Sequence, residues 1–378
     1  MALLSEEQTM IRDQAVAWVR DDSPVTQFRA MRDSGTPLGF FPETWDAMVN
    51  LGWPGMLIPE AYGGSGLGYL TFGVVLEQLG RHLTASPLFA SALVGASAII
   101  QAGNEAQKTW ILPKVADGSA IVSLALEEGA RHSPENTALT VKRSDSGYVL
   151  SGEKTFVMEG MAASHFVVVG RSAGSIGSLE GLSLFLIESS AAGLTRSRLA
   201  TMDARGYANL RFDDVAVPAE ALMGEEGTAA SHLGLILDIA RAGLAMEMLG
   251  TGGYAFEMTL DYLKTRKQFG QVIGSFQALG HRAASLYTEM ELARSCVEAA
   301  LQALDSGSED RESLVALSKA KAGAFLHDMS NQLIQIHGGI GMTDEFDAGF
   351  YLKRARVLEI SYGGVAYHKD RYATLLGF

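Results

Sequence analysis

The chain has 378 residues, and at about 150 residues per domain this length predicts two or three domains. Hydrophobic residues make up 47% and charged residues 19%, a composition that excludes a disordered or fibrous protein. Thirty basic residues against 43 acidic ones leave a net charge of −13, which argues against nucleic acid or an anionic membrane as the partner.

A single cysteine, Cys296, excludes an intramolecular disulfide and a cysteine-cluster metal site, and it favours a reducing compartment. The first residues are acidic where a signal peptide needs basic ones, and no segment reaches about 18 uninterrupted apolar residues. We therefore expect a cytoplasmic protein that does not span a membrane. Cys296 falls on a predicted core helix, which favours a buried structural thiol.

Residues 5–118 predict helices. Ser5 followed by two glutamates is typical of a helix start, and residues 71–79 and 91–100 are apolar on most faces, as in buried helices. The glycine-rich segment from Gly63 to Gly68 has two interpretations. A dinucleotide loop would need a preceding strand, but Pro59 and Glu60 precede it, so a turn between helices is favoured.

From residue 121 the pattern changes to short runs of β-branched and aromatic residues. Turn residues separate the runs, which favours a small β domain, a barrel or a sandwich. The predicted strands are residues 122–125, 148–150, 166–169, 182–187 and 210–212.

From about residue 231 the pattern is that of long helices. Apolar residues step by three or four from Leu279 to Leu304, and residues 233–263 and 314–336 behave similarly. Residues 305–308 form a short turn between two such helices. Long helices joined by short turns predict an antiparallel four-helix bundle. The predicted fold class is α+β, with an all-α domain at 1–120, a β domain at 121–228 and a helical bundle at 229–378.

Two segments at the ends of predicted bundle helices contain residues suited to a phosphorylated ligand. Arg266 precedes Gly270 in one, and Gly338 and Gly339 follow His337 in the other. An arginine grips phosphate with two donors, and glycine lets backbone N–H groups approach a ligand. The alternative is that both segments are ordinary helix C-caps. The eight histidines lack the spacing of helical metal sites, so no metal site is predicted.

These segments, taken in order, resemble the acyl-CoA dehydrogenases over essentially the whole chain. Four motifs carry the resemblance: Pro59-Glu60-Ala61-Tyr62-Gly63-Gly64-Ser65-Gly66, Arg211-Phe212-Asp213-Asp214-Val215-Ala216-Val217-Pro218, Arg266-Lys267-Gln268-Phe269-Gly270 and Gln335-Ile336-His337-Gly338-Gly339-Ile340-Gly341.

The resemblance implies a flavoprotein that binds FAD between the β domain and the bundle and removes hydrogens from an acyl-CoA thioester. A carboxylate takes the α proton while the flavin takes the β hydrogen as hydride. Electron-transferring flavoprotein is the implied electron acceptor, and a homo-oligomer or a homologous partner subunit, in a tetramer, is the implied assembly. The implied cofactor residues of the bundle, supplied to a neighbouring subunit, are Arg266, Gln268, Phe269, Gln335, Gly338 and Gly339.

The sequence departs from the family where the proton acceptor is expected. The family's glutamate falls on Gly363 in the Tyr362-Gly363-Gly364 run, and the alternative position, just before Arg241, is Ala240. Neither position carries a carboxylate, so no catalytic residue is assigned. Arg241 and Tyr362 are the expected active-site neighbours.

The flavin loop of the β domain departs as well. Where relatives carry Thr-Glu-Pro-Gly-Ala-Gly-Ser-Asp, this chain has residues 126–133, beginning with Leu126, and the family's Trp-Ile-Thr becomes Phe156-Val157-Met158. Leu126, Phe156 and Met158 are the implied flavin contacts of this domain. Two threonine hydroxyls are lost, so the flavin has fewer side-chain donors.

Three hypotheses follow. The chain is an acyl-CoA dehydrogenase for fatty acid or steroid degradation whose base is elsewhere. Alternatively, it is a subunit without a base in a mixed assembly, as in two-gene enzymes of steroid side-chain breakdown, or a flavin monooxygenase on the same fold. Asp238 and Glu247 are the nearest acids on the helix that carries Arg241, and neither is a convincing replacement for the base.

Overall fold

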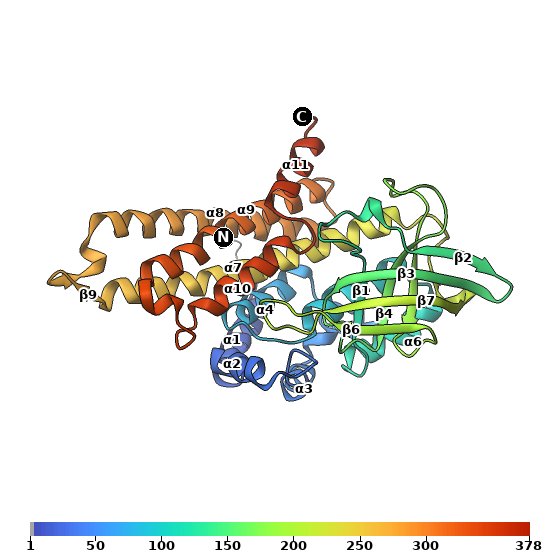
Figure 1. Cartoon of the computed structure of the whole chain (residues 1–378), viewed down its shortest axis with the longest axis horizontal. Helices are drawn as coiled ribbons and strands as arrows, with labels where there is room; N and C mark the ends of the chain where they lie inside the picture. The colour runs from blue at the N-terminus through green and yellow to red at the C-terminus, as the bar shows by residue number, and fades with distance from the viewer. Residues whose placement is uncertain (1–3) are drawn as a thin grey trace. The chain divides into compact units, whose positions relative to one another are not determined.

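A computed structural model describes residues 4–378, which form two compact units (Figure 1). Unit 1 combines the residues up to Arg29 with Tyr69–Thr84 and Arg241–Phe378, and unit 2 combines Ala30–Gly68 with Ala85–Ala240. No helix within 4–378 is both long enough and apolar enough to cross a membrane.

Unit 1 is helical. Ser5 caps its first helix as predicted, because its side chain accepts from the Gln8 N–H while the Gln8 side chain accepts from the Ser5 N–H. The helices of unit 1 are α1 (Glu6–Asp21), α4 (Tyr69–Arg81), most of α7 (Ala230–Thr265), α8 (Gln277–Ser306), α9 (Arg311–His337), α10 (Ala348–Ile360) and α11 (Val365–Leu375), with α2 (Val25–Ser34) passing into unit 2.

The bundle helices form where the apolar stripes predict them. The α8 stripe is buried at Ala283, Leu286, Val297 and Leu301, and α9 packs along α8 and also contacts α10 and α11. α8 ends before Gly307, whose φ of +65° suits a helix C-cap. Cys296 is half-buried rather than buried, because it lies one residue, about 100°, away from the stripe.

Helices α4 and α7 cross closely enough to need glycine on both sides. A Cβ at Gly80 would collide with the Glu247 carbonyl oxygen, and one at Gly250 with the Glu77 carbonyl oxygen. The Thr251 hydroxyl donates to the Gly80 carbonyl at 3.2 Å across this crossing. Backbone contact of this kind anchors the N-terminal helices to the bundle.

Unit 2 contains the remaining helices and the large sheet. Gly95 ends a π-helical segment against β1, where a Cβ would lie 2.5 Å from the Val122 oxygen. The glycine-rich segment at 63–66 is a loop after a short 3₁₀ turn, with Gly63 and Gly66 at positive φ, and no strand precedes it in the described chain. The helices are α3 (Pro42–Asn50), the π-helix Leu88–Gly95, α5 (Ala96–Ala102) and α6 (Glu105–Ala116).

The sheet has eight strands in the order β6-β7-β3-β2-β4-β5-β8, and β1 pairs in parallel with β4. Its core is a cluster of buried apolar residues such as Leu150, Phe166, Phe185 and Phe212. The strands are β1 (Val122–Ala125), β2 (Thr140–Ser144), β3 (Gly147–Val157), β4 (His165–Arg171), β5 (Leu182–Glu188), β6 (Leu194–Arg198), β7 (Ala208–Pro218) and β8 (Leu222–Met223).

All five predicted strands are present in the large sheet, but three other strands of this sheet were not predicted. β2 and β6 are mostly exposed and rich in charged residues, and β8 has only two residues. Their pairing comes from backbone hydrogen bonds to neighbouring strands, which a hydrophobic pattern does not reveal. The architecture is therefore helices, a central sheet and further helices, in agreement with the α+β prediction.

Candidate functional site

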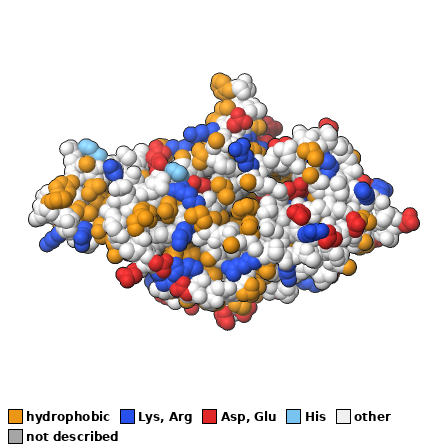
Figure 2. All heavy atoms as spheres, viewed as in Figure 1, with side chains coloured by type: hydrophobic (Ala, Val, Ile, Leu, Met, Phe, Trp, Pro, Cys, Tyr) orange, Lys and Arg blue, Asp and Glu red, His pale blue; other side chains and the backbone are white. Residues whose placement is uncertain are grey.

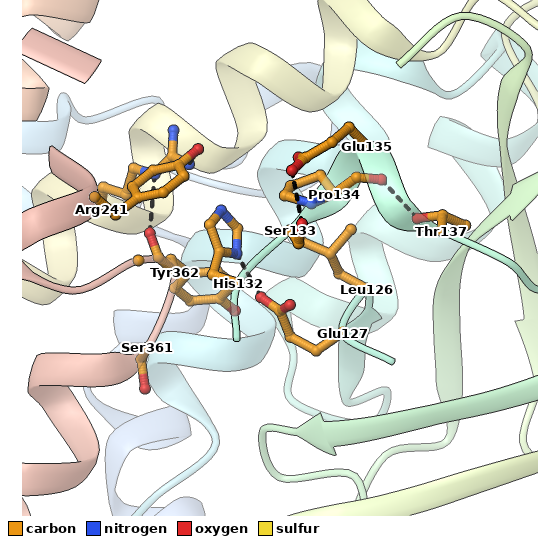
Figure 3. A network of polar contacts seen from close by, with 12 residues as sticks. Leu126, Glu127, His132, Ser133, Pro134, Glu135, Thr137, Arg241, Ser361 and Tyr362 are labelled. Carbon is orange, nitrogen blue, oxygen red and sulfur yellow. Dashed lines mark hydrogen bonds and ion pairs between the residues drawn. The ribbon is translucent and has the colours of Figure 1, made fainter. Parts of the chain in front are cut away.

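The loop between α10 and α11 carries Tyr362 and Gly363. The carbonyl oxygen of Tyr362 accepts from Arg241 Nε at 3.2 Å (Figure 3). It also accepts from His368 Nε2 at 3.1 Å. Arg241 is 1% exposed, and its Nη2 also donates to the Tyr367 hydroxyl at 3.3 Å. The structure thus brings together the two expected active-site neighbours, and it does so through the backbone of the loop.

Gly363 has no room for a side chain. Its φ is +101°, and a Cβ there would lie 2.5 Å from Tyr367 Cδ1 and 2.9 Å from His368 Nε2. Its N–H donates to the Ile360 carbonyl at 3.3 Å. The preceding residue, Tyr362, also has a positive φ, +53°, and it is buried at 7% exposure. A carboxylate at position 363 would require both neighbouring rings to move.

Lys319 of α9 holds this loop from inside the protein. Its Nζ donates to the carbonyls of Leu358 at 3.2 Å, Glu359 at 3.3 Å and Gly363 at 3.1 Å, and the residue is 1% exposed. Burial, together with the nearby charge of Arg241, lowers the pKa of Lys319 to about 7, and Glu359 opposes this shift. This buried amine was not predictable from a local pattern, because its three acceptors lie about 40 residues further along the chain.

Asp238 and Glu247, the two acids considered on α7, are both buried. Glu247 is buried and its Oε1 accepts from Arg354 Nε at 2.9 Å and Nη2 at 2.6 Å, so this carboxylate is committed to an internal ion pair. Asp238 and Ala240 are both fully buried. Ala240 belongs to unit 2 and Arg241 to unit 1.

Arg266, Gln268 and Phe269 lie on a hairpin at the end of α7, formed by β9 (Lys267–Gln268) and β10 (Gln271–Val272) (Figure 1). Phe269 has a φ of +52° and is 91% exposed. The Arg266 guanidinium has no hydrogen-bond or ion-pair partner among residues 4–378. An unpaired cation beside an exposed aromatic ring suits a ligand or a second subunit.

Gln335, Gly338 and Gly339 lie at the end of α9, close to that hairpin. His337 connects the end of α9 to the end of α7, which leads into the hairpin. Its ring packs against Tyr262 of α7 with a centroid distance of 4.3 Å, and its carbonyl accepts from the Tyr262 hydroxyl at 3.4 Å. Gly338 has a φ of +62°, and no atom lies within 4 Å of a Cβ built on either glycine. The bundle therefore brings both predicted segments together and leaves their glycines open, as an approaching phosphate requires.

The flavin loop of the β domain is shaped by a buried ion pair. Lys154 Nζ donates to Glu128 Oε1 at 2.6 Å and to the Leu126 carbonyl at 3.0 Å. The Glu128 carboxylate also accepts from the N–H groups of Ala138 at 2.7 Å and Leu139 at 3.0 Å. Burial lowers the pKa of Lys154, and Glu128 opposes the shift.

A second acid in the loop pairs with a histidine, and this pair was not predicted from the sequence. Glu127 Oε1 accepts from His132 Nδ1 at 2.6 Å, and the His132 side chain is 3% exposed (Figure 3). Because the carboxylate only accepts, the imidazole has its proton on Nδ1. The two residues are five apart in an irregular loop, where no periodicity predicts contact.

Phe156 and Met158 lie at the end of β3, where the register with β7 shifts after Lys154. Phe156 is half-buried at a φ of +51°, and its ring meets Tyr207 edge-on at 6.3 Å. Met158 is half-buried as well. The bulge turns a partly accessible aromatic ring out of the strand, which suits stacking against a flat cofactor.

Each unit taken by itself has groups that fit part of a flavin nucleotide. In unit 2 the backbone N–H groups of Leu126, Glu127 and Gly129 have no acceptor among the described residues. In unit 1 Arg266 and the open glycines provide the cation and backbone donors that phosphate needs. The fold and these donors define a flavin-dependent protein of the helix–sheet–helix type.

Comparison with known proteins gives the family. The descriptions that match are acyl-CoA dehydrogenase N-terminal domain over residues 5–119, middle domain over 123–215 and C-terminal domain over 225–374. The mitochondrial isovaleryl-CoA dehydrogenase of Solanum tuberosum is 31% identical, over 86% of this chain and 80% of the relative. The chain belongs to the acyl-CoA dehydrogenase family, whose members are FAD-binding oxidoreductases acting on CH–CH groups.

Two solved structures are similar over almost the full length. Butyryl-CoA dehydrogenase from Megasphaera elsdenii is 26% identical with a TM-score of 0.90, covering 100% of this chain and 99% of that one. A variant of the steroid ACAD Tcur3481-Tcur3483 is 30% identical with a TM-score of 0.88, covering 98% of each chain.

Proposed function

We propose that this chain takes part in the FAD-dependent α,β-dehydrogenation of an acyl-CoA thioester, as a subunit that lacks its own catalytic carboxylate. The observation that carries this proposal is the loop at Gly363, where the backbone φ and the rings of Tyr367 and His368 exclude a side chain. Glu247, the other acid considered, is held by Arg354. Proton removal therefore needs a carboxylate from elsewhere.

The residues of this chain have binding and positioning roles in the proposal. FAD, when bound, would supply the acceptor for the β hydrogen of the substrate. Arg266 would hold the pyrophosphate of the cofactor, and the N–H groups at Gly338 and Gly339 would complete the phosphate contacts. Phe156 would stack on the flavin ring from the β domain. Arg241 and Lys319 fix the Tyr362–Gly363 loop from the bundle.

The missing carboxylate is proposed to come from a homologous subunit in a tetramer. The similarity to the steroid ACAD Tcur3481-Tcur3483, whose name joins two designations, supports a mixed assembly. Exposed apolar residues of unit 1 supply contact surface, and Figure 2 shows such side chains gathered on the helical part. They include Phe269, Tyr287, Leu292, Ile340, Met342 and Ile360.

Electron-transferring flavoprotein is the proposed electron acceptor, since the reduced flavin must be reoxidised in every cycle. The proposal divides the chain into three domains, at 1–120, 121–228 and 229–378. The flavin contacts of the β domain, Leu126, Phe156 and Met158, then belong to the second domain, and those of the bundle to the third.

The test compares this chain purified alone with the chain co-purified with homologues from its native cell. Both are titrated anaerobically with a panel of acyl-CoA thioesters while the flavin absorbance is followed. Bleaching is expected only in the mixed assembly, because general-base assistance contributes about 10²–10⁴-fold to the rate. Strong bleaching of the chain purified alone would refute the absence of a base.

Arg266→Ala tests the phosphate contact. The substitution is expected to lower the flavin content of the purified assembly, because it removes an otherwise unpaired cation from a site with an anionic cofactor. Lys267→Ala is the matched control, since it removes the same charge from the same hairpin. Equal flavin content in the two variants, at the same oligomeric state, would remove Arg266 from the site.

A further inference from the structure

Arg171, the last residue of β4, donates hydrogen bonds only to backbone carbonyl groups. Its Nε donates to the Thr137 carbonyl at 2.8 Å and its Nη2 to the Glu135 carbonyl at 2.9 Å. Both acceptors belong to residues 134–139, which we call the return segment because it connects the flavin loop at 126–133 to β2. No carboxylate within residues 4–378 forms an ion pair with Arg171, so its charge acts on the peptide backbone alone.

The same guanidinium holds the connection between β4 and β5, residues 172–181. Its Nη1 donates to the Glu180 carbonyl at 2.9 Å and its Nη2 to the Ser178 carbonyl at 2.8 Å. The Gly177 N–H of this connection donates to the Glu135 carbonyl at 2.9 Å, so the two segments also touch directly. A guanidinium has five N–H donors in a fixed planar fork, and this geometry fixes the return segment against the connection.

The connection is itself closed at its base, so it gives the return segment a firm support. The N–H groups of Ser172 and Ala173 donate to the Gly181 carbonyl at 2.9 and 3.2 Å. The Ser172 hydroxyl lies 2.8 Å from the Ser183 hydroxyl of β5. Gly181 has a φ of +78°, and a Cβ there would lie 2.0 Å from the Ala173 carbonyl oxygen, so this closure requires glycine.

A carboxylate holds the return segment on its N–H side. Glu128 of the flavin loop accepts from the N–H groups of Ala138 at 2.7 Å and Leu139 at 3.0 Å, and Lys154 Nζ donates to it at 2.6 Å. Arg171 therefore binds two carbonyls of the return segment while Glu128 binds two of its N–H groups. Each charged group meets backbone atoms of the opposite partial charge, which strengthens these hydrogen bonds.

Glu128 lies between peptide groups that are open to a ligand. The N–H groups of Leu126, Glu127 and Gly129 have no acceptor among the described residues. We infer that Arg171 is a positioning residue for flavin binding, which acts through the return segment and Glu128 to order these N–H groups before the cofactor binds. The inference rests on the proposed role of residues 126–133 as flavin contacts, and it adds a residue whose guanidinium is engaged with the backbone rather than with the cofactor.

The expected effect of a substitution at Arg171 is on the affinity for FAD. If the substitution leaves the loop ordered in only about one molecule in ten, the apparent Kd for FAD rises about tenfold, because only the ordered fraction binds. A rise of this size is expected for Arg171→Met, which removes every donor. Arg171→Lys keeps the charge but loses the planar fork, so the Kd should rise by a smaller factor.

The test is equilibrium dialysis of the full chain against FAD, with the Kd taken from the absorbance of bound flavin. Arg198→Met and Arg198→Lys are the matched controls, because Arg198 also lies in unit 2 and donates to a backbone carbonyl, that of Gly35 at 3.2 Å. Gly35 lies outside residues 126–139, so the control variants should leave the Kd unchanged. Denaturant unfolding of the flavin-free chain is measured for each variant alongside.

An unchanged Kd in Arg171→Met would overturn the inference, and a lower unfolding midpoint of the flavin-free chain with that unchanged Kd would show that Arg171 serves only the fold. If Arg171→Met does not fold, Arg171→Lys decides, since a Kd equal to that of Arg198→Lys would overturn the inference as well. A raised Kd in Arg266→Ala beside an unchanged one in Arg171→Met would refute the positioning role and leave the proposed flavin site intact. None of these measurements depends on flavin bleaching by a thioester.

Discussion

The buried amine of Lys319 makes the stability of this protein depend on pH in a predictable direction. Replacing Lys319 by Met removes the titrating group and leaves three carbonyls, at Leu358, Glu359 and Gly363, without their donor. Loss of a buried hydrogen-bond partner costs about 1–3 kcal/mol each. The substitution also removes the cost of burying a charged amine, which raises the free energy of unfolding. Near pH 7 this gain opposes the loss of the three hydrogen bonds.

The pH slope separates these effects. The pKa of Lys319 is about 7 in the folded protein and 10.5 when unperturbed, so between these values the unfolded chain binds more protons. The free energy of unfolding therefore rises with pH in this window, by up to about 1.4 kcal/mol per pH unit. Integrated from half-titration at pH 7 to pH 9, the gain of the wild type over Lys319→Met is about 2 kcal/mol.

The assay is denaturant unfolding at fixed protein concentration and fixed ionic strength, repeated at intervals from pH 7 to pH 9. Lys321→Met is the matched control, since Lys321 lies two residues away on α9 and its amine reaches Glu289 at 2.7 Å on a half-buried surface. The difference between wild type and Lys319→Met should grow with pH, and the difference for Lys321→Met should stay flat. Parallel curves for Lys319→Met and wild type would refute the argument.

Three further outcomes are expected. Gly363→Glu should lower the thermal unfolding temperature without restoring flavin bleaching by acyl-CoA thioesters, because the new side chain meets Tyr367 and His368. Tyr362→Glu is the comparison, since it places a carboxylate in the loop without filling the space at Gly363. Restored bleaching in Gly363→Glu would contradict the claim that position 363 has no room for a carboxylate. Gly80→Ala should destabilise unit 1 by about 1–3 kcal/mol in denaturant unfolding, because the new methyl group meets the Glu247 backbone, while Gly234→Ala, with open space around it on α7, should be neutral or stabilising. Arg354→Met should cost about 3–5 kcal/mol by leaving Glu247 buried and unpaired; adding Glu247→Gln should recover part of this loss, and simple additivity would argue against the pair.

Local sequence patterns were sufficient to predict the order of helical and β segments along the chain. The α8 stripe and the strand at 122–125 were predictable because burial on one face produces a local period of 3.6 or 2 residues. The N-cap at Ser5 and the helix end at Gly307 were also predictable, because each depends only on residues within one helical turn. The family resemblance rested on short motifs that are likewise local.

The contacts between buried polar groups, in contrast, depend on how the chain folds over long sequence separations. Lys319 has the sequence environment of an ordinary surface lysine on a helix, yet its amine lies against carbonyls about 40 residues away. Glu128 and Lys154 are 26 residues apart, and Glu247 and Arg354 are 107 apart. A buried charge is stable only where the folded chain supplies its partner, so these contacts, and the space denied to a side chain at Gly363, follow from packing rather than from any local pattern.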